Sequence, residues 1–431
     1  MEYRASKTKN VSENYNKDRI SKREIITRKS LNDIQTDEDY IYSELNHNST
    51  IKISGFPNIG FSCYMNSFLQ ILFHTPFFLS LLKQNYKEKE KKNLIDCLIS
   101  LSESPNNIYI LYKIKDLMGE IDDNFRKNIQ KDSQYFGIML INEIISLFKN
   151  DFSINDDYND SNDNNDESNE KISIFEIEKK KTKLFKDYIN KYHNEKDETF
   201  VEKMFQFHES KVKIDKNQLT NDLKVKRIDF ETFLSADLIF PFDNQKRKYN
   251  IYDLLKNRYS PLSLLRQEPR KNNKSKIELF WDSAKNYLKE FVNDNNSNDN
   301  IDNSEKNPIR KNFIIRRFYS LPNILILTLN RMIFGKPFNN SKFKIDEKID
   351  LKDFLDENNN EEITTYSLYG LNECYKFKEK YGHYYSYVKI NNIWYFFDDK
   401  RVLEKDPEFE SKDVVGLYYI RDTFQRINNN Q

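Results

Sequence analysis

Cysteine is rare in this sequence of 431 residues, which contains only Cys63, Cys97 and Cys374. Three cysteines cannot build the disulfide framework of a small secreted domain, and they cannot supply a zinc site with four cysteine ligands. Free thiols persist in reducing compartments, so the composition predicts a protein of the cytoplasm, the nucleus or both.

Long apolar runs and an excess of either charge are also absent. No stretch of about 18 apolar residues occurs, and the start MEYRASKTKN lacks the apolar segment of a signal peptide. Lys and Arg number 69 against 68 Asp and Glu, a net charge of +1. Such a balance creates no global field toward nucleic acid or an anionic membrane. We therefore expect neither as a partner, and we expect a monomer.

The polar segments suggest how the chain is organised. Residues 1–50 are charged and lack periodicity, which predicts a mostly disordered extension, and residues 51–424 are expected to form one domain. Asn- and Asp-rich segments near 153–172 and 292–308 are too polar to offset their ordering entropy, so they are expected to be surface insertions. A shorter polar run begins at Asp356. In the extension, the basic cluster Lys22, Arg23, Arg28 and Lys29 fits either a nuclear address or a solvated tail.

The apolar pattern changes from helical to strand-like along the chain. The run CYMNSFLQILFHTPFFLSLL has apolar residues at helical spacing and predicts a buried helix that begins close to Cys63, and a second helix of this kind is expected from Gln134. After about residue 225 the apolar runs become shorter and richer in Ile, Phe and Tyr, which is typical of strands. Helices first and a sheet later predict an α+β fold.

Cys63 is a candidate nucleophile because of where it stands. It follows a glycine-containing turn and occupies the first turn of the expected helix. Unpaired N–H groups and the positive end of the helix dipole favour a thiolate at that position. The alternative is that Cys63 is a small buried hydrophobic residue, as free cysteines often are.

A second segment, YGHYYSYVKINNIWYFFDD, can supply a base. Its alternating residues predict two strands joined by a two-residue turn at Asn391 and Asn392. In that register, Asp398 lies diagonally across from His383, about 7–8 Å away by Cα, whereas Asp399 lies on the other face of the sheet. The pattern therefore selects Asp398 as the partner of His383, unless a bulge shifts the register.

Both segments resemble the cysteine and histidine boxes of the ubiquitin-specific protease family. In this sequence, GFPNIGFSCYMNSFLQ is similar to the family's cysteine box. The segments GHYYSYV and WYFFDD are similar to its histidine box. The resemblance implies a papain-like fold with a helical thumb and an antiparallel-sheet palm and fingers. It implies Cys63 as nucleophile, His383 as general base, Asp398 as the residue that orients the base, and Asn58 as a donor to the oxyanion. An amide suits that last role, although Asn58 after Pro57 can also simply form a turn.

Further segments extend the resemblance and show departures from it. IQKDSQYFGIML resembles a further family segment, which implies that Asp132 and Gln134 bind the tail of the modifier, but Tyr135 replaces the usual Glu. Tyr384, which matches the histidine box, is a third residue expected to bind substrate. Asp132 can also be read as a helix N-cap. Phe61 replaces the customary Asn two residues before the cysteine. The two CxxC pairs of many members are absent, so we expect fingers held by packing, no metal and no cofactor, and activity without zinc.

The function implied is that of a thiol-dependent deubiquitinase, a cysteine protease that hydrolyses the isopeptide or peptide bond after the C-terminal glycine of ubiquitin. Its partners would be ubiquitin and ubiquitinated proteins. Two alternatives stay open: a catalytically inactive scaffold that binds ubiquitin, and a protease for another ubiquitin-like modifier. Inactive relatives generally lose the cysteine or the histidine, and this sequence has both Cys63 and His383.

Overall fold

The computed structural model describes most of the chain between Lys52 and Thr423. The described residues are 52–86, 93–149, 174–192, 198–216, 223–240, 248–259, 311–331, 339–356, 359, 361–378 and 381–423. The expected N-terminal extension and nearly all of the two expected insertions lie outside them.

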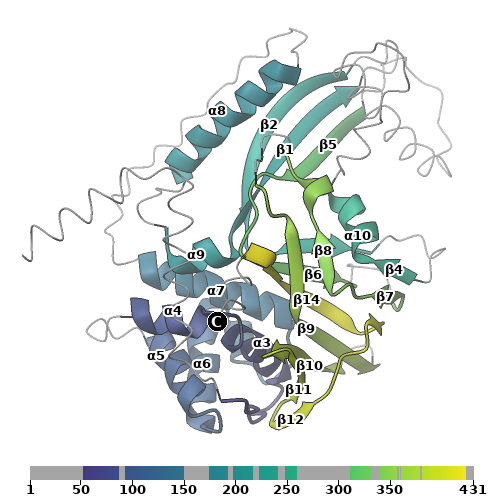
Figure 1. Ribbon diagram of the computed structural model, residues 1–431. Coiled ribbons are helices and arrows are strands. Elements are labelled where there is room, and N and C mark those ends of the chain that lie inside the picture. Colours follow the sequence, from purple (N-terminus) through teal and green to yellow (C-terminus); the bar gives the residue numbers. More distant parts are fainter. Residues whose placement is uncertain are drawn as a thin grey trace, which may run out of the picture. The chain divides into compact units, whose positions relative to one another are not determined.

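The helices gather in the first half of the chain, as the sequence predicts (Figure 1). They are α3 (Cys63–Phe73), α4 (Phe78–Asn85), α5 (Asn93–Glu103), α6 (Ile108–Ile121), α7 (Ser133–Lys149), α8 (Ile174–Tyr192), α9 (Phe200–Phe205) and α10 (Ile251–Arg258), with 3-10 turns η3 (Asp123–Phe125) and η5 (Lys352–Phe354). Side chains cap several of them. Asn107 caps α6, whereas α9 and α10 begin with capping boxes at Thr199 and Asn250.

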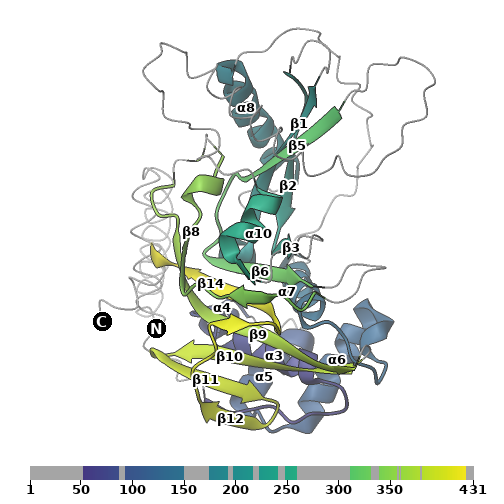
Figure 2. The ribbon, with the colours of Figure 1, turned by 90° about the vertical axis from the view of Figure 1, so that its right-hand side faces the viewer.

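The strands form three sheets (Figure 2). The largest has the order β12-β11-β10-β9-β14-β6-β3, with β8 also paired to β9, and the smaller two have the orders β2-β1-β5 and β13-β7-β4. The strands are β1 (Phe207–Lys216), β2 (Leu223–Phe233), β3 (Ala236–Ile239), β4 (Lys248–Asn250), β5 (Lys311–Phe318), β6 (Ile324–Asn330), β7 (Lys342–Lys344), β8 (Lys348–Asp350), β9 (Thr365–Lys378), β10 (Tyr381–Ile390), β11 (Ile393–Asp398), β12 (Arg401–Glu404), β13 (Glu410–Ser411) and β14 (Val414–Arg421). The predicted strands after residue 225 are therefore present.

Helix α3 is the centre of the helical part, and all of its residues are buried. It packs against β9, β10 and β11 on one side and against α7 on the other. Phe68 of α3 makes edge contacts with Phe136 of α7 and Tyr418 of β14. A helix with apolar residues all around its surface needs such enclosure on every side. The enclosure places the start of α3, and thus Cys63, next to the sheet.

The helix predicted to continue beyond α3 is interrupted. Residues 63–82 form two helices, α3 and α4, because the chain turns between Phe73 and Phe78. Pro76 has no N–H to continue the hydrogen-bond ladder, and Phe77 adopts a left-handed φ of 64°. No single described helix is long and apolar enough to span a membrane; α3 and α4 pass that test only together, with a bend of 83° between them.

The β2-β1-β5 sheet corresponds to the expected fingers, and α8 packs against its strand β2. Phe185 of α8 contacts Tyr319 and Phe230, with ring centroids 4.2 and 5.1 Å apart. Lys181 of α8 forms a buried ion pair of 3.0 Å with Asp356. The polar run that begins at Asp356 is therefore anchored in the interior at its first residue. Packing and this ion pair hold the described part of the fingers together.

The close approach of α3 and α7 depends on a glycine. A Cβ atom at Gly137 would overlap the ring of Phe68. We predict that Gly137→Ala lowers the free energy of unfolding by about 1–3 kcal/mol through overpacking, although alanine is the better helix former. Urea unfolding measures the change.

Gly119 of α6 offers a matched control. A Cβ there comes closest to the partly exposed side chain of Arg126, which can move more easily than the enclosed ring of Phe68, so Gly119→Ala should be less destabilising than Gly137→Ala. Equal stability of Gly137→Ala and the parent protein would contradict the tight packing of α3 on α7.

Candidate active site

Cys63 is the first residue of α3, and it is only 4% exposed. The chain reaches it through Gly60 and Phe61, which have left-handed φ values of 97° and 50°. Glycine adopts this conformation freely, whereas a bulky residue does so only when the surroundings hold it. The Ser62 hydroxyl accepts a hydrogen bond from the Ile59 N–H at 2.9 Å. The loop thus turns sharply and brings the thiol to the N-terminus of α3.

Asn58 forms the turn that its sequence allows, and its amide also contacts a carboxylate. Its side-chain oxygen accepts hydrogen bonds from the N–H groups of Gly60 at 3.0 Å and Ser62 at 3.3 Å, so it shapes the turn before the cysteine. Its amide nitrogen donates to Asp399 at 2.8 Å. An amide nitrogen carries two hydrogens, so the second remains for another acceptor. The turn therefore holds the Asn58 amide in a defined direction.

His383 and Asp398 lie on the hairpin formed by β10 and β11. The turn residues Asn391 and Asn392 have φ values of 49° and 64°, which a two-residue hairpin of type I′ requires. The register is the predicted one, and the pairing continues as far as Ser386 and Phe397. Beyond that pair the strands separate, and no bulge occurs within the paired part.

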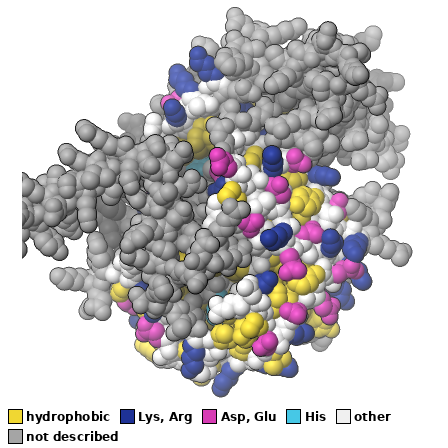
Figure 3. All heavy atoms as spheres, in the orientation of Figure 1, with side chains coloured by type: hydrophobic (Ala, Val, Ile, Leu, Met, Phe, Trp, Pro, Cys, Tyr) yellow, Lys and Arg dark blue, Asp and Glu magenta, His cyan; other side chains and the backbone are white. Residues whose placement is uncertain are grey.

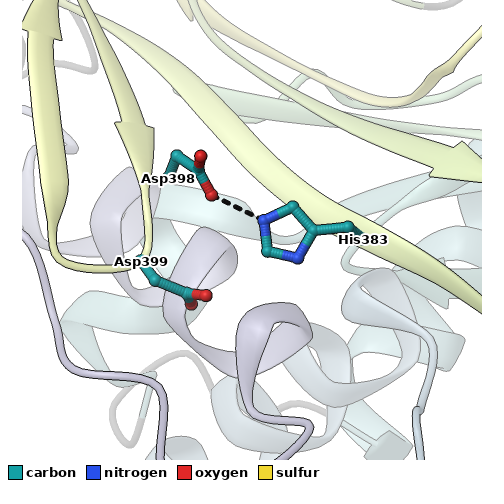
Figure 4. A group of neighbouring side chains, drawn as sticks. All are labelled: His383, Asp398 and Asp399. Carbon is teal, nitrogen blue, oxygen red and sulfur yellow. Dashed lines mark hydrogen bonds and ion pairs between the residues drawn. The ribbon is translucent and has the colours of Figure 1, made fainter.

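The imidazole of His383 is hydrogen-bonded on two sides. Its Nε2 lies 2.5 Å from a carboxylate oxygen of Asp398, and Figure 4 shows this carboxylate directed at the ring. Both side chains are about one-third exposed. The hydrogen bond with Cys63 raises the pKa of His383 to about 9, burial opposes the rise, and the bond with Asp398 adds to it. The structure therefore brings the thiol, the imidazole and the carboxylate into one line of contacts.

Asp399 belongs to the site although the sequence placed it on the opposite face. It occupies the turn between β11 and β12 with a left-handed φ of 50°. Its carboxylate accepts hydrogen bonds from the side chains of Asn58 at 2.8 Å and Asn66 at 2.7 Å. Its carbonyl accepts from the Phe56 N–H at 3.0 Å, and Gly55 leaves no space for a Cβ against this turn. The turn after Asp398 is therefore pressed onto the loop before Cys63.

Asp132 performs the capping role that the sequence left open, and it also faces the sheet. One carboxylate oxygen accepts from the Tyr135 N–H at 2.8 Å at the start of α7. The other oxygen lies 3.4 Å from the hydroxyl of Tyr384, the residue after His383. Tyr135 stacks on Phe125 and is half exposed. Asp132 and Tyr384 thus lie together beside His383.

Gln134 does not have the surface position expected of a residue that binds a ligand. It is 3% exposed, and its carbonyl oxygen accepts a hydrogen bond from Tyr418 at 2.9 Å. It also lies so close to Gly416 that a Cβ there would collide with it. The rotation of α7 turns this residue toward the sheet. The role of Gln134 in ligand binding stays a prediction, and in this structure the residue packs in the interior.

One cluster of possible metal ligands occurs among the described residues. The only group of three close His, Cys, Asp or Glu side chains in these ranges is His383, Asp398 and Asp399, whose ligand atoms lie within 4.8 Å of one another. Hydrogen bonds already explain their directions, because Asp398 meets His383 and Asp399 meets Asn58. The sulfur of Cys63 completes a protease-type arrangement with the first two.

Comparison with known proteins gives a consistent family. The ubiquitin carboxyl-terminal hydrolase family model matches residues 54–419. Ubiquitin carboxyl-terminal hydrolase 4 of Arabidopsis thaliana is 26% identical over 81% of this chain and 84% of its own length. Ubiquitin carboxyl-terminal hydrolase 20 of the same plant is 31% identical, but the match covers 27% of this chain and only 16% of that protein.

Solved structures show the same fold. The Ubp8 DUB module bound to ubiquitin aldehyde aligns with a TM-score of 0.55 at 17% identity, over 86% of this chain and 71% of that chain. The module bound to monoubiquitin aligns with a TM-score of 0.52 at 16% identity, over 86% and 69% of the two chains. The predicted α+β, papain-like architecture is thereby confirmed. Because the family model covers most of the residues, the chain belongs to the ubiquitin carboxyl-terminal hydrolase family.

Proposed function

We propose that the chain is a thiol-dependent deubiquitinase that hydrolyses the bond after the C-terminal glycine of ubiquitin on protein conjugates. The observation that carries this proposal is the contact between Cys63, at the start of a buried helix, and His383, which Asp398 holds from the other side. Nucleophile, base and orienting carboxylate within hydrogen-bonding reach are the requirement of cysteine protease chemistry.

The proposed mechanism follows from these positions. His383 takes the proton of Cys63, and the thiolate attacks the carbonyl of the terminal glycine. Asn58 donates its second amide hydrogen to the oxyanion, with Asp399 holding the amide in place. The His383 imidazolium then protonates the leaving amine, and water hydrolyses the thioester with the imidazole again as base.

Ubiquitin as substrate is supported by the family and by the solved neighbours. Those neighbours are Ubp8 structures bound to monoubiquitin and to ubiquitin aldehyde. In this chain, Asp132 and Tyr384 lie beside His383, where a tail leading to the scissile bond would pass. We propose them as residues that contact the tail, whereas Gln134 is hydrogen-bonded to Tyr418 and would contact the tail only after a rearrangement.

The location and the partners of the protein are proposed from its sequence. A cytoplasmic or nuclear location agrees with three free thiols. On the face shown in Figure 3, the described positive and negative side chains are interspersed, which gives no support to nucleic acid or an anionic membrane as a partner. The expectation of a monomer gains no support from the neighbours, in which Ubp8 belongs to a module with Sgf11, Sus1 and Sgf73.

We predict that the full chain forms a covalent adduct with ubiquitin that carries a thiol-reactive C-terminus, and that Cys63→Ala abolishes it. Gel mobility and intact mass measure the adduct. Cys97→Ala is the matched control, because this buried thiol lies on α5 and its pKa is raised by burial. Zinc chelation should leave the reaction unchanged.

The outcomes of this test separate the alternatives. Reaction with a related modifier but not with ubiquitin would support a protease of another modifier. Binding of ubiquitin without an adduct would support the inactive scaffold and contradict the proposed activity.

The pKa of His383, raised to about 9, predicts the alkaline side of the pH profile. Because the imidazolium must protonate the leaving amine, kcat/KM should fall as the pH rises through about 9. Asp398→Asn removes one contribution to this rise and should move the fall to lower pH, besides reducing the rate. Hydrolysis of a fluorogenic ubiquitin amide between pH 6 and 10 measures both effects. If Asp398→Asn leaves the pH of the alkaline fall unchanged, Asp398 does not contribute to the raised pKa of His383.

Asp399→Ala should lower kcat by about 10²-fold with a smaller effect on KM, because Asn58 acts on the oxyanion and loses its anchor. Steady-state hydrolysis of the ubiquitin amide measures this. Asp406→Ala is the control, because that aspartate is exposed and lies beyond β12. A rise in KM with kcat unchanged would show that Asp399 does not act through the oxyanion donor.

A further inference from the structure

Gln130 makes two hydrogen bonds to a single residue of the catalytic strand. Its side-chain amide donates to the Gly382 carbonyl at 2.5 Å, and its side-chain oxygen accepts from the Gly382 N–H at 2.7 Å. Gly382 immediately precedes His383. The glutamine amide therefore pairs with the backbone of Gly382 in the way that a neighbouring strand would.

The position of this pair follows from the β10–β11 hairpin. The hairpin is closed by the pair Ile390 and Ile393. Counting back by twos from Ile390, every second residue of β10 directs its N–H and its C=O toward the β11 side, and Gly382 is one of these residues. The pairing with β11 ends at Ser386, so Gly382 faces an edge that has lost its strand partner. Gln130 occupies that edge and satisfies both groups.

The same loop holds the residue on the other side of the histidine. Asp132 lies 3.4 Å from the Tyr384 hydroxyl, so residues 130 and 132 contact the two neighbours of His383. This loop leads into α7, and α7 packs on α3, which begins with Cys63. Contacts therefore connect Cys63, through α3, α7 and this loop, to strand β10, which carries His383.

We propose that Gln130 is a positioning residue that sets the distance between the Cys63 thiol and the His383 imidazole by fixing the backbone of Gly382. The proposal rests on the proposed function in one respect, namely that His383 is the base for Cys63. Gln130 touches neither group itself. Its action is through the strand edge, where two hydrogen bonds restrict the peptide next to the histidine.

The test uses the reactivity of the thiol, which requires no ubiquitin. The full chain and its variants Gln130→Ala and Gln130→Met are treated with iodoacetamide from pH 5.5 to 9.5, and alkylation of the Cys63 peptide is followed by mass spectrometry. An isolated thiol ionises only near pH 8.5, whereas a thiol that can pass its proton to a nearby imidazole reacts at lower pH. Methionine keeps the length of glutamine without its hydrogen bonds. Thermal unfolding checks that the variants are folded.

We expect both variants to react about tenfold more slowly than the parent at pH 6.5, as for a shift of one pH unit, and to approach it above pH 8.5. Lys131→Ala, in the same loop, should behave as the parent. In hydrolysis of a ubiquitin amide, the Gln130 variants should lose kcat with little change in KM. Their alkaline limb should move to lower pH, because a displaced His383 loses the Cys63 hydrogen bond that raises its pKa.

The outcomes distinguish this proposal from the proposed function. If Gln130→Met is folded and its alkylation follows the parent at every pH, the positioning role is overturned. If the Gln130 variants change the alkylation while the parent fails to cleave ubiquitin, the positioning role stands and the deubiquitinase activity is contradicted. If Lys131→Ala has the same effect as the Gln130 variants, general disturbance of the loop explains the result and the specific role of Gln130 is rejected.

Discussion

The hydrogen bond between the Cys63 thiol and the His383 imidazole is the contact on which the proposed chemistry of this protein depends. The two residues belong to different layers, one at the start of a buried helix and the other on the sheet against which that helix packs. Neither layer alone provides both groups. Apolar burial of α3 supplies the stability that brings them together, because hydrogen bonds contribute only about 1 kcal/mol each in net terms. The direction of the contact, however, is set by polar groups at the edges of the packed layers.

Three polar connections restrain that contact from different sides. Asp398 holds the ring of His383, Asp399 joins the next turn to Asn58, and Gln130 holds the backbone before the histidine. In the proposed reaction, two adjacent aspartates therefore have different roles: Asp398 orients the base, and Asp399 orients the amide that would face the oxyanion. The left-handed conformation of Asp399 makes this possible, since it reverses the chain within the turn and lets neighbouring side chains point to different partners.

Local pattern predicts a feature well where the physical cause is itself local. The turn at Asn391 and Asn392 fixes the hairpin register, and the register alone selected Asp398. The contact of Asp399 with Asn58 could not be found this way, because it requires the docking of segments more than 300 residues apart. The burial of Gln134 depends on the rotation of α7 about its axis, which tertiary packing decides. Asp356 stands at the start of a polar run, and only its distant partner Lys181 shows that it is an interior residue.

Departures from the family pattern fall at exposed positions, which suggests a division between chemistry and recognition. Phe61 and Tyr135 replace polar residues of the family boxes, and they are 43% and 49% exposed, whereas Cys63 is 4% exposed. A change at an exposed position alters what the surface can contact without moving the enclosed groups. Tyr135 illustrates this, since it stacks on Phe125 and donates its hydroxyl to Asp122 instead of presenting a carboxylate. The interior therefore keeps the groups that the proposed thiol chemistry needs, while these two departures lie on the surface around them.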